Sequence, residues 1–290
     1  MQIVQIKNLE TTLSSKKAAD YLRVNESTVK RWADSGLLNC IKTPGGHRKF
    51  KIEDLKLLAK RYDYETSYLS LADDMTDLQQ NILNRKYKPI IKNLQKNILK
   101  GNVNITYKLL YTLYINNSSL EEIFDGVVYE CMRNIGLLWQ NKVIGVENEH
   151  IASNTTLTAL HQLNTVIQKN EQSKGLAICA GFQDEFHEIG LLCVKIFLEY
   201  HGWKVLYPGI NLPYKSLIQL VDKNKPLLVC LSATYIKNVR QFEKQIKNLK
   251  KRVEKYGGVL YIGGGNVNII KGLDINCNSI DELKKSLNKH

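Results

Sequence analysis

A chain of 290 residues is long enough for two or three domains. Its composition, 43% apolar and 24% charged, is typical of a globular protein and excludes a disordered or fibrous one. No apolar run approaches the ~18 residues that span a bilayer. Charged residues also break up the apolar stretches that a signal peptide would need near the N-terminus, so we expect a cytoplasmic protein without a membrane partner.

The net charge of +13 favours a polyanionic partner, and its distribution indicates where that partner binds. Residues 1–61 hold 13 Lys and Arg against 6 Asp and Glu, a net +7, so the other 229 residues share +6. The excess is concentrated at the N-terminal end. We therefore expect a surface for phosphate groups there.

The six cysteines lie far apart and form no C-x-x-C pair, so their spacing does not favour a zinc site. Three of them sit inside apolar runs, which favours reduced thiols in the core. The six are Cys40, Cys131, Cys179, Cys193, Cys230 and Cys277.

Two short helical patterns open the chain after residue 12. Asn25 is the expected N-cap of the second helix, and Gly36 is expected to end it. Val29 and Trp32 fall on one side of this helix and would hold it to its domain, while the other side would enter the major groove of DNA. The side chains expected to contact DNA from this helix are Thr28, Lys30 and Arg31.

A glycine-containing loop, Thr43-Pro-Gly-Gly-His-Arg-Lys-Phe50, follows and leads into a helix from Ile52. Adjacent glycines permit a tight hairpin, and its two cations would meet the phosphate backbone. The residues of this expected wing that would contact DNA are Gly46, His47, Arg48 and Lys49. Taken alone, His47 is more often a structural loop histidine than a base reader.

Three stretches occur in order over residues 12–62, namely Ala-Ala-x-x-Leu, Thr-Val-Lys-Arg-Trp and Gly-Gly-His-Arg-Lys-Phe. As a set they resemble the winged helix-turn-helix of MerR-type regulators. The resemblance implies an all-α winged helix-turn-helix domain at residues 1–70 and a double-stranded DNA operator as partner. The alternative is a small helical domain whose basic residues form only a solvated face.

A hydrophilic joint from Asp63 to Asp77 leads into a second helical region. Apolar residues recur there at helical spacing, for example at Ile91, Leu94 and Ile98. Ser119 and Glu122 have the spacing of a capping box. About four helices joined by short loops predict an antiparallel four-helix bundle at residues 78–170.

From Gly175 the pattern changes to short apolar runs rich in β-formers that alternate with helical stretches. Alternation over ~30 residues predicts an α/β domain with a parallel, doubly wound sheet of the Rossmann-like (flavodoxin-like) kind at residues 172–290. The expected strands are 176–180, 204–207, 227–231 and 259–262, and the expected helices are 188–200, 214–221 and 239–256.

The motif Glu185-x-His187-x-x-Gly190 follows the first of these strands. Ligands of open α/β sheets bind beyond the carboxyl ends of the strands, and a neutral imidazole is a good donor to cobalt. Glu185 is placed to orient the ring of His187. Taken alone, a loop histidine is usually structural.

Two more motifs follow later strands, Leu231-Ser-Ala-Thr234 and Ile262-Gly-Gly-Gly265. The three together resemble methionine synthase-type cobalamin-binding domains, although the first position there is Asp and here is Glu185. The resemblance implies that His187 is the lower axial ligand of cobalt and that the nucleotide tail enters a slot in the sheet. The other residues it assigns to cobalamin are Glu185, Gly190, Ser232, Thr234, Gly263, Gly264 and Gly265.

Trp139 precedes the pair Glu149 and His150 with nine residues between them. On spacing alone a core tryptophan and a carboxylate at a helix start are the simpler interpretation. With both flanking domains, the spacing resembles the W-x9-E-H motif of CarH/LitR-type photoreceptor repressors, which use adenosylcobalamin. The resemblance implies that Trp139, Glu149 and His150 cap the upper cobalt face. The light-sensing relatives have a histidine directly after the tryptophan, whereas this chain has Gln140, a poor cobalt ligand.

These resemblances together imply a non-enzymatic transcription regulator, a repressor that binds DNA as a cofactor-dependent tetramer and senses light through its adenosylcobalamin. Gln140 keeps open a light-independent cobalamin sensor, or a regulator that works without cobalamin. A corrinoid carrier for methyl transfer is a further alternative, which the N-terminal helix-turn-helix argues against.

Overall fold

The computed structural model describes residues 12–22, 24–43, 45–62, 80–82, 84–265 and 276–288. The chain divides into two compact units, Met1–Gln79 and Gln80–His290, and each is described by itself. No described helix has both the length and the apolar character required to cross a membrane.

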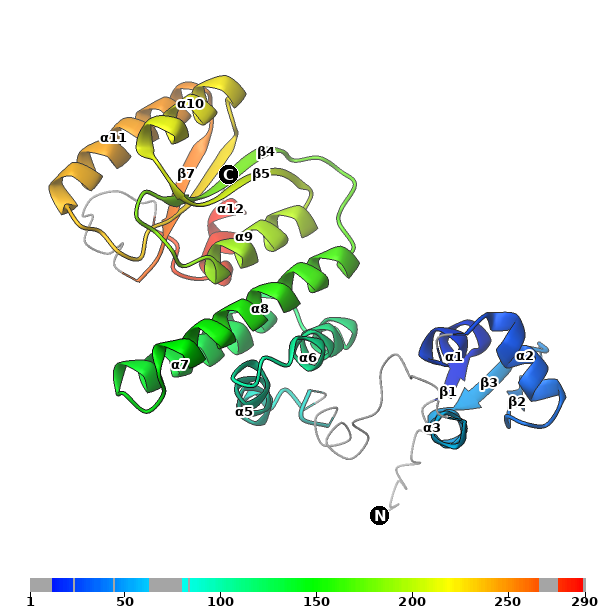
Figure 1. Cartoon of the computed structure of the whole chain (residues 1–290). Helices are drawn as coiled ribbons and strands as arrows, with labels where there is room; N and C mark the ends of the chain where they lie inside the picture. The colour runs from blue at the N-terminus through cyan, green and yellow to red at the C-terminus, as the bar shows by residue number, and fades with distance from the viewer. Residues whose placement is uncertain are drawn as a thin grey trace, which may run out of the picture. The chain divides into compact units, whose positions relative to one another are not determined.

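The N-terminal unit packs three helices against a small antiparallel sheet of strand order β1-β3-β2. The two predicted helices, the predicted wing and the helix after it are all present (Figure 1). The three-residue strand β1 was not predicted, so the description of this domain as all-α was incomplete. The elements are β1 (Thr12–Ser14), α1 (Ser15–Leu22), α2 (Glu26–Asp34), β2 (Ile41–Lys42), β3 (Arg48–Lys51) and α3 (Ile52–Arg61).

Helix α2 shows the two faces that the sequence predicted. Val29 and Trp32 are buried in the core of the unit, and Arg31 is exposed. Asn25 is the N-cap residue, although its side chain makes no capping hydrogen bond. Gly36 follows the end of the helix with φ +73°, a left-handed conformation that favours glycine.

The second unit begins with a helical bundle (Figure 1). Its elements are α5 (Tyr87–Ile98), α6 (Val103–Ile115), η1 (Glu122–Tyr129), α7 (Glu130–Gln140) and α8 (Val146–Val166). The predicted capping box is present, because the Ser119 hydroxyl accepts from the Glu122 amide at 3.2 Å and the Glu122 carboxylate accepts from the Ser119 amide at 2.9 Å. The segment η1 is a π-helix, which the sequence did not predict, and it runs directly into α7.

The bundle is followed by a parallel four-stranded sheet of order β5-β4-β6-β7. The first strand therefore lies between the second and third, which is the order of a flavodoxin-like sheet, the kind of sheet that the sequence predicted. The remaining elements are β4 (Gly175–Phe182), α9 (Ile189–Tyr200), β5 (Trp203–Leu212), α10 (Tyr214–Asn224), β6 (Leu228–Ser232), α11 (Val239–Lys255), β7 (Val259–Gly263) and α12 (Ile280–Leu287).

Strand β5 runs five residues further than predicted, through Pro208 and Gly209. It is an edge strand, where a proline costs no ladder hydrogen bond on the outer side, and Gly209 has φ +84° beside a register shift against β4. The position of β5 at the sheet edge therefore allows the strand to continue through Pro208 and Gly209, beyond the end that the local sequence predicted.

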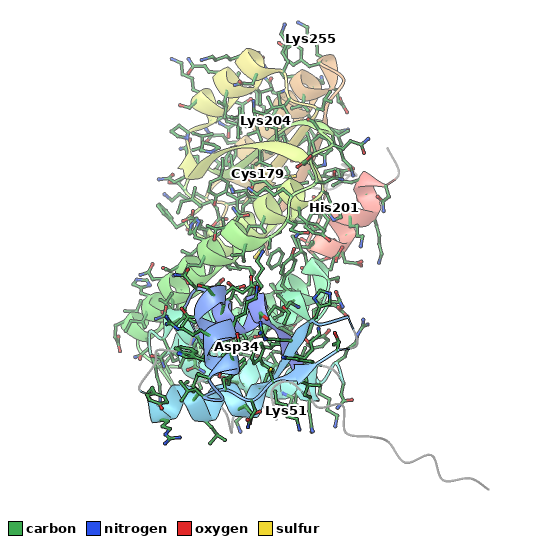
Figure 2. All side chains as sticks on the ribbon, turned by 90° about the vertical axis from the view of Figure 1, so that its right-hand side faces the viewer. Asp34, Lys51, Cys179, His201, Lys204 and Lys255 are labelled. Carbon is green, nitrogen blue, oxygen red and sulfur yellow. The ribbon has the colours of Figure 1, made fainter. Side chains whose placement is uncertain are left out.

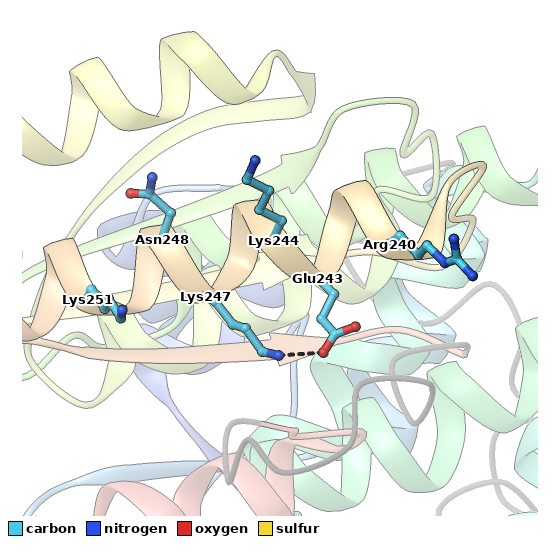
Figure 3. Close-up of a pocket in the computed structure, with 6 residues that line it drawn as sticks. All are labelled: Arg240, Glu243, Lys244, Lys247, Asn248 and Lys251. Atoms are coloured by element: carbon cyan, nitrogen blue, oxygen red, sulfur yellow. Dashed lines mark hydrogen bonds and ion pairs between the residues drawn. The ribbon is translucent and has the colours of Figure 1, made fainter.

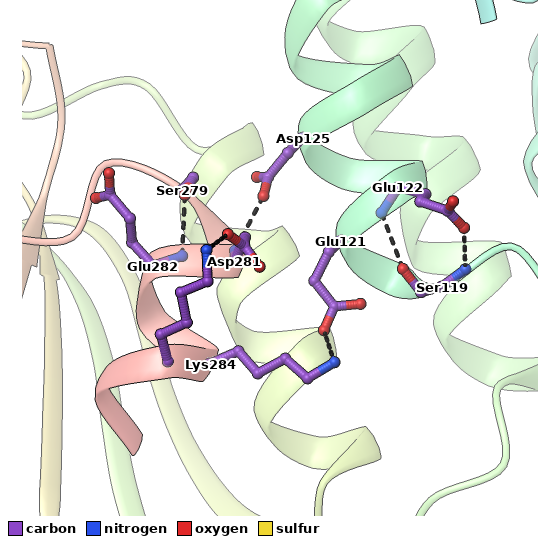
Figure 4. Close-up of polar contacts among 9 residues, drawn as sticks. Ser119, Glu121, Glu122, Asp125, Ser279, Asp281, Glu282 and Lys284 are labelled. Atoms are coloured by element: carbon purple, nitrogen blue, oxygen red, sulfur yellow. Dashed lines mark hydrogen bonds and ion pairs between the residues drawn. The ribbon is translucent and has the colours of Figure 1, made fainter. Parts of the chain in front are cut away.

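Helices cover both faces of the sheet. Helices α10 and α11 lie on one face, whereas α9 and α12 lie on the face toward the bundle, where α8 packs against α9 (Figure 1). Asp125 of η1 accepts hydrogen bonds from the amides of Ile280 and Asp281, both at 3.0 Å, and Lys284 lies 2.7 Å from Glu121 (Figure 4). The start of α12 is thus held by the π-helical segment of the bundle.

The cysteines are free thiols, and all except the half-buried Cys40 are buried. Cys179 lies within the sheet domain, as Figure 2 shows. Burial raises the pKa of Cys131 to about 12, which keeps this thiol protonated. The prediction of reduced core thiols is consistent with this burial.

Candidate functional site

The carboxyl ends of β4 and β6 bring together the first predicted motif and the second. Glu185 follows β4 and is fully buried, while the side chain of His187 is 71% exposed. One carboxylate oxygen of Glu185 lies 2.7 Å from His187 Nδ1 and accepts the His187 backbone N–H at 2.7 Å. The other oxygen accepts the backbone N–H of Thr234, which follows β6. The buried carboxylate therefore joins the two loops at the switch point of the sheet.

Glu185 and His187 each shift the pKa of the other. Burial alone would raise the pKa of Glu185, but hydrogen bonds from His187 and Thr234 outweigh it and lower the pKa to about 2. The same contact raises the pKa of His187 against the opposing effect of desolvation, and the charge of Glu149 raises it further. Glu185 is therefore an anion that orients the imidazole.

The orientation of His187 leaves one ring nitrogen for a ligand. With Nδ1 assigned as the donor to Glu185, Nε2 carries the free lone pair on a largely exposed ring. A metal-binding histidine usually has this arrangement, in which a carboxylate holds the other nitrogen. The Glu185–His187 pair thus offers one ligand atom, His187 Nε2. It fits a metal ion whose other ligands belong to a bound cofactor.

The glycines at the end of β7 and directly after it, Gly263 and Gly264, are tightly packed by neighbouring backbone. A Cβ atom on Gly263 would lie 2.7 Å from the Cys277 carbonyl oxygen, and one on Gly264, with φ +131°, would lie 2.5 Å from the Ala233 carbonyl oxygen. Packing within the protein therefore accounts for these two glycines. Gly265 is exposed and beside Thr234, whereas Gly190, at the start of α9, has open space around it.

Ser232 ends β6, where it is in register with Gly181 on one side and Gly263 on the other. The predicted serine, threonine and glycine motifs therefore lie at one edge of the sheet, beside the Glu185–His187 pair. Gly181 was not singled out from the sequence, although a Cβ there would lie 2.8 Å from the Ile210 Cα.

The bundle residues lie at the hairpin between α7 and α8. Trp139 is 50% exposed, so the alternative of a core tryptophan is wrong. Glu149 lies 2.7 Å from His150 Nδ1 and accepts from the Ser153 hydroxyl at 2.7 Å. Gln140 is exposed. Apolar side chains are unusually exposed around this hairpin, at Leu137, Trp139, Val143, Val146 and Ile151.

The predicted DNA-contacting residues of α2 differ in their exposure and in whether they form an ion pair within the protein. Arg31 is exposed and has no ion pair within the described residues. Lys30 pairs with Glu26 at 2.8 Å, and Thr28 is half-buried.

The wing residues also differ in their exposure and in their ion pairs. Gly46 is exposed with φ +77°, and a hydrogen bond between Thr43 and His47 at 2.9 Å closes the hairpin. Lys49 is half-buried. Arg48 lies 2.5 Å from Asp34 at the end of α2, so it is not the free cation that the sequence suggested. Asp34 could not be identified from local sequence, because the two charges are 14 positions apart and only the fold brings them together.

Three family models match the chain. One is a helix-turn-helix domain over residues 12–62, and two are B12 binding domains, over residues 90–164 and 175–272. Comparison with curated protein sequences finds no match.

Among solved structures, the chain resembles the Methanosarcina barkeri monomethylamine corrinoid protein with a TM-score of 0.59 and 18% identity, over 70% of this chain and 99% of that one. A cobalamin-binding protein from Desulfitobacterium hafniense DCB-2 matches with a TM-score of 0.37 and 17% identity, over 74% and 97%. The methanol:cobalamin methyltransferase complex of Methanosarcina barkeri matches with 0.34 and 17%, over 83% and 92%.

The first of these likenesses supports the fold of the second unit, a helical bundle followed by a Rossmann-like parallel sheet. The two B12 binding domains coincide with those two parts, and the helix-turn-helix domain coincides with the N-terminal unit. The chain is therefore a cobalamin-binding protein with a helix-turn-helix domain.

Proposed function

We propose that this chain is a cytoplasmic, DNA-binding transcription regulator, a repressor, controlled by adenosylcobalamin. In this proposal residues 1–70 are a MerR-type winged helix-turn-helix, residues 78–170 are a bundle that caps the cofactor, and residues 172–290 bind it. The observation that carries the proposal is the Glu185–His187 pair at the switch point of the sheet, in a chain that also has a helix-turn-helix. No residue is assigned a catalytic role.

His187 is the proposed lower axial ligand of cobalt. Its exposed Nε2 and its fixed Nδ1 fit that role, and the buried carboxylate of Glu185 limits rotation of the ring. The anchoring of Glu185 on the Thr234 amide ties this orientation to β6.

The nucleotide tail of the cofactor is proposed to lie along the ends of β4, β6 and β7. Ser232 and Thr234 offer hydroxyl groups there, and Gly190 and Gly265 leave space. Gly263 and Gly264 allow the loops after β6 and β7 to pack closely. Their proposed role is therefore to shape the slot.

The upper face of cobalt is proposed to meet the hairpin between α7 and α8. The exposed ring of Trp139 offers an apolar surface for the adenosyl group, and Glu149 and His150 add polar contacts. The influence of Glu149 on the pKa of His187 supports placing both residues at one site. Adenosylcobalamin supplies a Co–C bond that light can break.

DNA binding is proposed to use α2 and the wing. Arg31 offers an exposed cation of α2 beside Thr28 and the ion-paired Lys30. The wing hairpin would contact the phosphate backbone through Gly46, His47, Arg48 and Lys49. Because one wing contributes few contacts, affinity for an operator would rise when several copies bind together.

Control is proposed to work by linkage between the cofactor and assembly. If the cofactor binds the assembled tetramer more tightly than the separate chains, its presence favours the tetramer and therefore operator binding. The hairpin between α7 and α8 exposes apolar side chains. These support a contact surface that has different partners with and without the cofactor.

The test is a gel shift of the full chain on a duplex obtained by in vitro selection. We expect a tight complex with adenosylcobalamin in darkness and a weaker one after green illumination. Identical shifts with and without the cofactor would overturn cobalamin control. The absorption spectrum of the same samples reports separately whether cobalamin is bound.

A second candidate is a regulator that senses the cobalamin level without light. Gln140 favours it, because an amide at this exposed position is a poor replacement for the histidine of the light-sensing relatives. Under this candidate the dark and illuminated gel shifts agree while the shift without cofactor differs.

A corrinoid carrier for methyl transfer is the third candidate, favoured by the likeness in fold to a corrinoid protein. A methyl carrier, however, has no evident use for a helix-turn-helix domain. Demethylation of added methylcobalamin by common methyl acceptors, catalysed by the chain with a partner, would support it.

A further inference from the structure

A second concentration of positive charge lies in the sequence well after the helix-turn-helix domain. Residues 201–260 contain 12 Lys and Arg and only 3 Asp and Glu, a net +9. The remainder of the chain after residue 61 is therefore slightly acidic, since residues 62–290 together carry +6. This second basic region includes α10 and α11, which cover the face of the sheet turned away from the bundle (Figure 1).

Helix α11 has one buried face and one basic face. Phe242, Ile246, Leu249 and Val253 pack into the core of the sheet domain. The outer face bears a groove lined by Arg240, Glu243, Lys244, Lys247, Asn248 and Lys251 (Figure 3). We call these six residues the α11 groove.

Most of the positive charge in the α11 groove is not neutralised by the protein. Glu243 is its one acidic residue and pairs with Lys247 at 2.6 Å. Arg240, Lys244 and Lys251 are exposed and have no ion pair within the described residues. From Arg240 to Lys251 the groove extends over ~16 Å of helix, at ~1.5 Å per residue. Duplex DNA presents about one charge per 1.7 Å of its axis, so several phosphates fit this length.

The composition of the α11 groove indicates which polyanion it suits. Single-stranded nucleic acids are bound with aromatic side chains on which bases stack, and no aromatic residue lines the groove. Helices that lie on anionic membranes insert an apolar face, and no apolar residue lines it either. Cations with one amide, from Asn248, are the usual contacts of a duplex backbone.

We propose that the α11 groove is a second, sequence-independent contact for double-stranded DNA, which binds phosphates beyond the segment read by the winged helix-turn-helix. This inference rests on the DNA binding proposed above. It assigns a role in DNA affinity to the cobalamin-binding part of the chain.

The test compares two full-length variants that lose equal charge. The first carries Arg240→Gln, Lys244→Gln and Lys251→Gln. The matched control carries Lys88→Gln, Lys92→Gln and Lys96→Gln, three exposed lysines along one face of α5. Binding is measured by fluorescence anisotropy on a short duplex that holds only the selected site and on one extended at both ends. Thermal unfolding verifies that both variants fold.

We expect the α11 variant to match wild type on the short duplex and to bind the extended one more weakly. Its salt dependence on the extended duplex should become shallower by about one unit per lost phosphate contact. The α5 variant should retain the wild-type preference for the extended duplex.

Equal behaviour of the two variants on the extended duplex would overturn the α11 proposal while leaving the winged-helix contact intact. Failure of wild type on the short duplex would instead overturn the proposed function, and the α11 proposal with it. A different outcome is that the α11 variant loses binding to a single-stranded oligonucleotide or to anionic lipid vesicles and keeps its binding to the duplex. That result would assign the groove to that partner and overturn the proposed contact with double-stranded DNA.

Discussion

Arg48 Nη2 lies 2.5 Å from Asp34 Oδ1, so an ion pair joins the wing to the end of helix α2. Both elements are proposed to contact DNA. The pair therefore fixes the wing relative to the recognition helix and at the same time reduces the charge that Arg48 offers to phosphate.

Replacement of Asp34 by Asn should free the guanidinium of Arg48 for a phosphate. Because Asp34 is largely exposed, we expect a change in stability of only about 0–1 kcal/mol. The salt dependence of DNA binding should steepen by about one unit. The measurement is a double-mutant cycle with Arg48→Gln, in which the loss of affinity is larger in the Asp34→Asn background. An equal loss in both backgrounds would show that the pair does not limit Arg48.

Glu185→Gln should weaken cobalamin binding although residue 185 is not the proposed cobalt ligand. The amide keeps the shape of the side chain but removes the charge that holds His187 Nδ1, and loss of such an outer partner typically costs ~10–100-fold in metal affinity. The absorption spectrum should shift toward a cobalamin without imidazole ligation. Asp184→Asn is the matched control, since Asp184 lies beside Glu185 but pairs with Lys237 at 3.3 Å. A similar loss in both variants would contradict the positioning role.

Trp139→Ala should change function more than stability. The ring is half exposed, so its removal should cost less than the ~3–5 kcal/mol of a core tryptophan. We expect weaker binding of adenosylcobalamin, with little change for hydroxocobalamin, in calorimetric titrations. Val143→Ala on the same hairpin, where the side chain is 66% exposed, serves as the control. Equal losses for both cobalamins would argue against contact with the adenosyl group.

The ion pair of Glu121 and Lys284 should make the contact between bundle and α12 sensitive to pH. Burial opposes the shift, but Lys284 lowers the pKa of Glu121 below its ordinary value of 4.5, and Glu121 raises the pKa of Lys284 above 10.5. The stabilisation is therefore present between these two values and declines as the pH falls below 4.5 or rises above 10.5. Unfolding midpoints of wild type and Glu121→Gln should differ most near neutral pH and converge in acid. A constant difference across the acid range would contradict this linkage.

The order and type of most elements could be predicted from local patterns. Alternating apolar runs and helical periods gave the sheet domain, because each unit must bury one apolar face against the next. The capping box at Ser119 and the glycine at position 36 were predicted for the same local reason. The Glu185–His187 contact was also accessible, since only one residue separates the two side chains.

The features that escaped prediction depend on distant partners. Strand β1 exists because Thr12–Ser14 pairs with β3, and the π-helical turn of η1 coincides with the capping of α12 by Asp125. The pairing of Arg48 with Asp34 likewise requires the folded wing. The basic face of α11 escaped prediction for another reason, because the slightly acidic remainder of residues 62–290 offsets most of its charge in their net +6.

The buried thiols offer a built-in reporter of motion in the second unit. Cys40 is half-buried in the N-terminal unit, and the other five cysteines are buried beyond residue 130. In a Cys40→Ser variant, alkylation by a maleimide would proceed only when the cobalamin-binding part of the chain opens. A ligand that binds the closed form would slow this labelling by mass action, so chemical modification rates could rank corrinoids without any DNA in the assay.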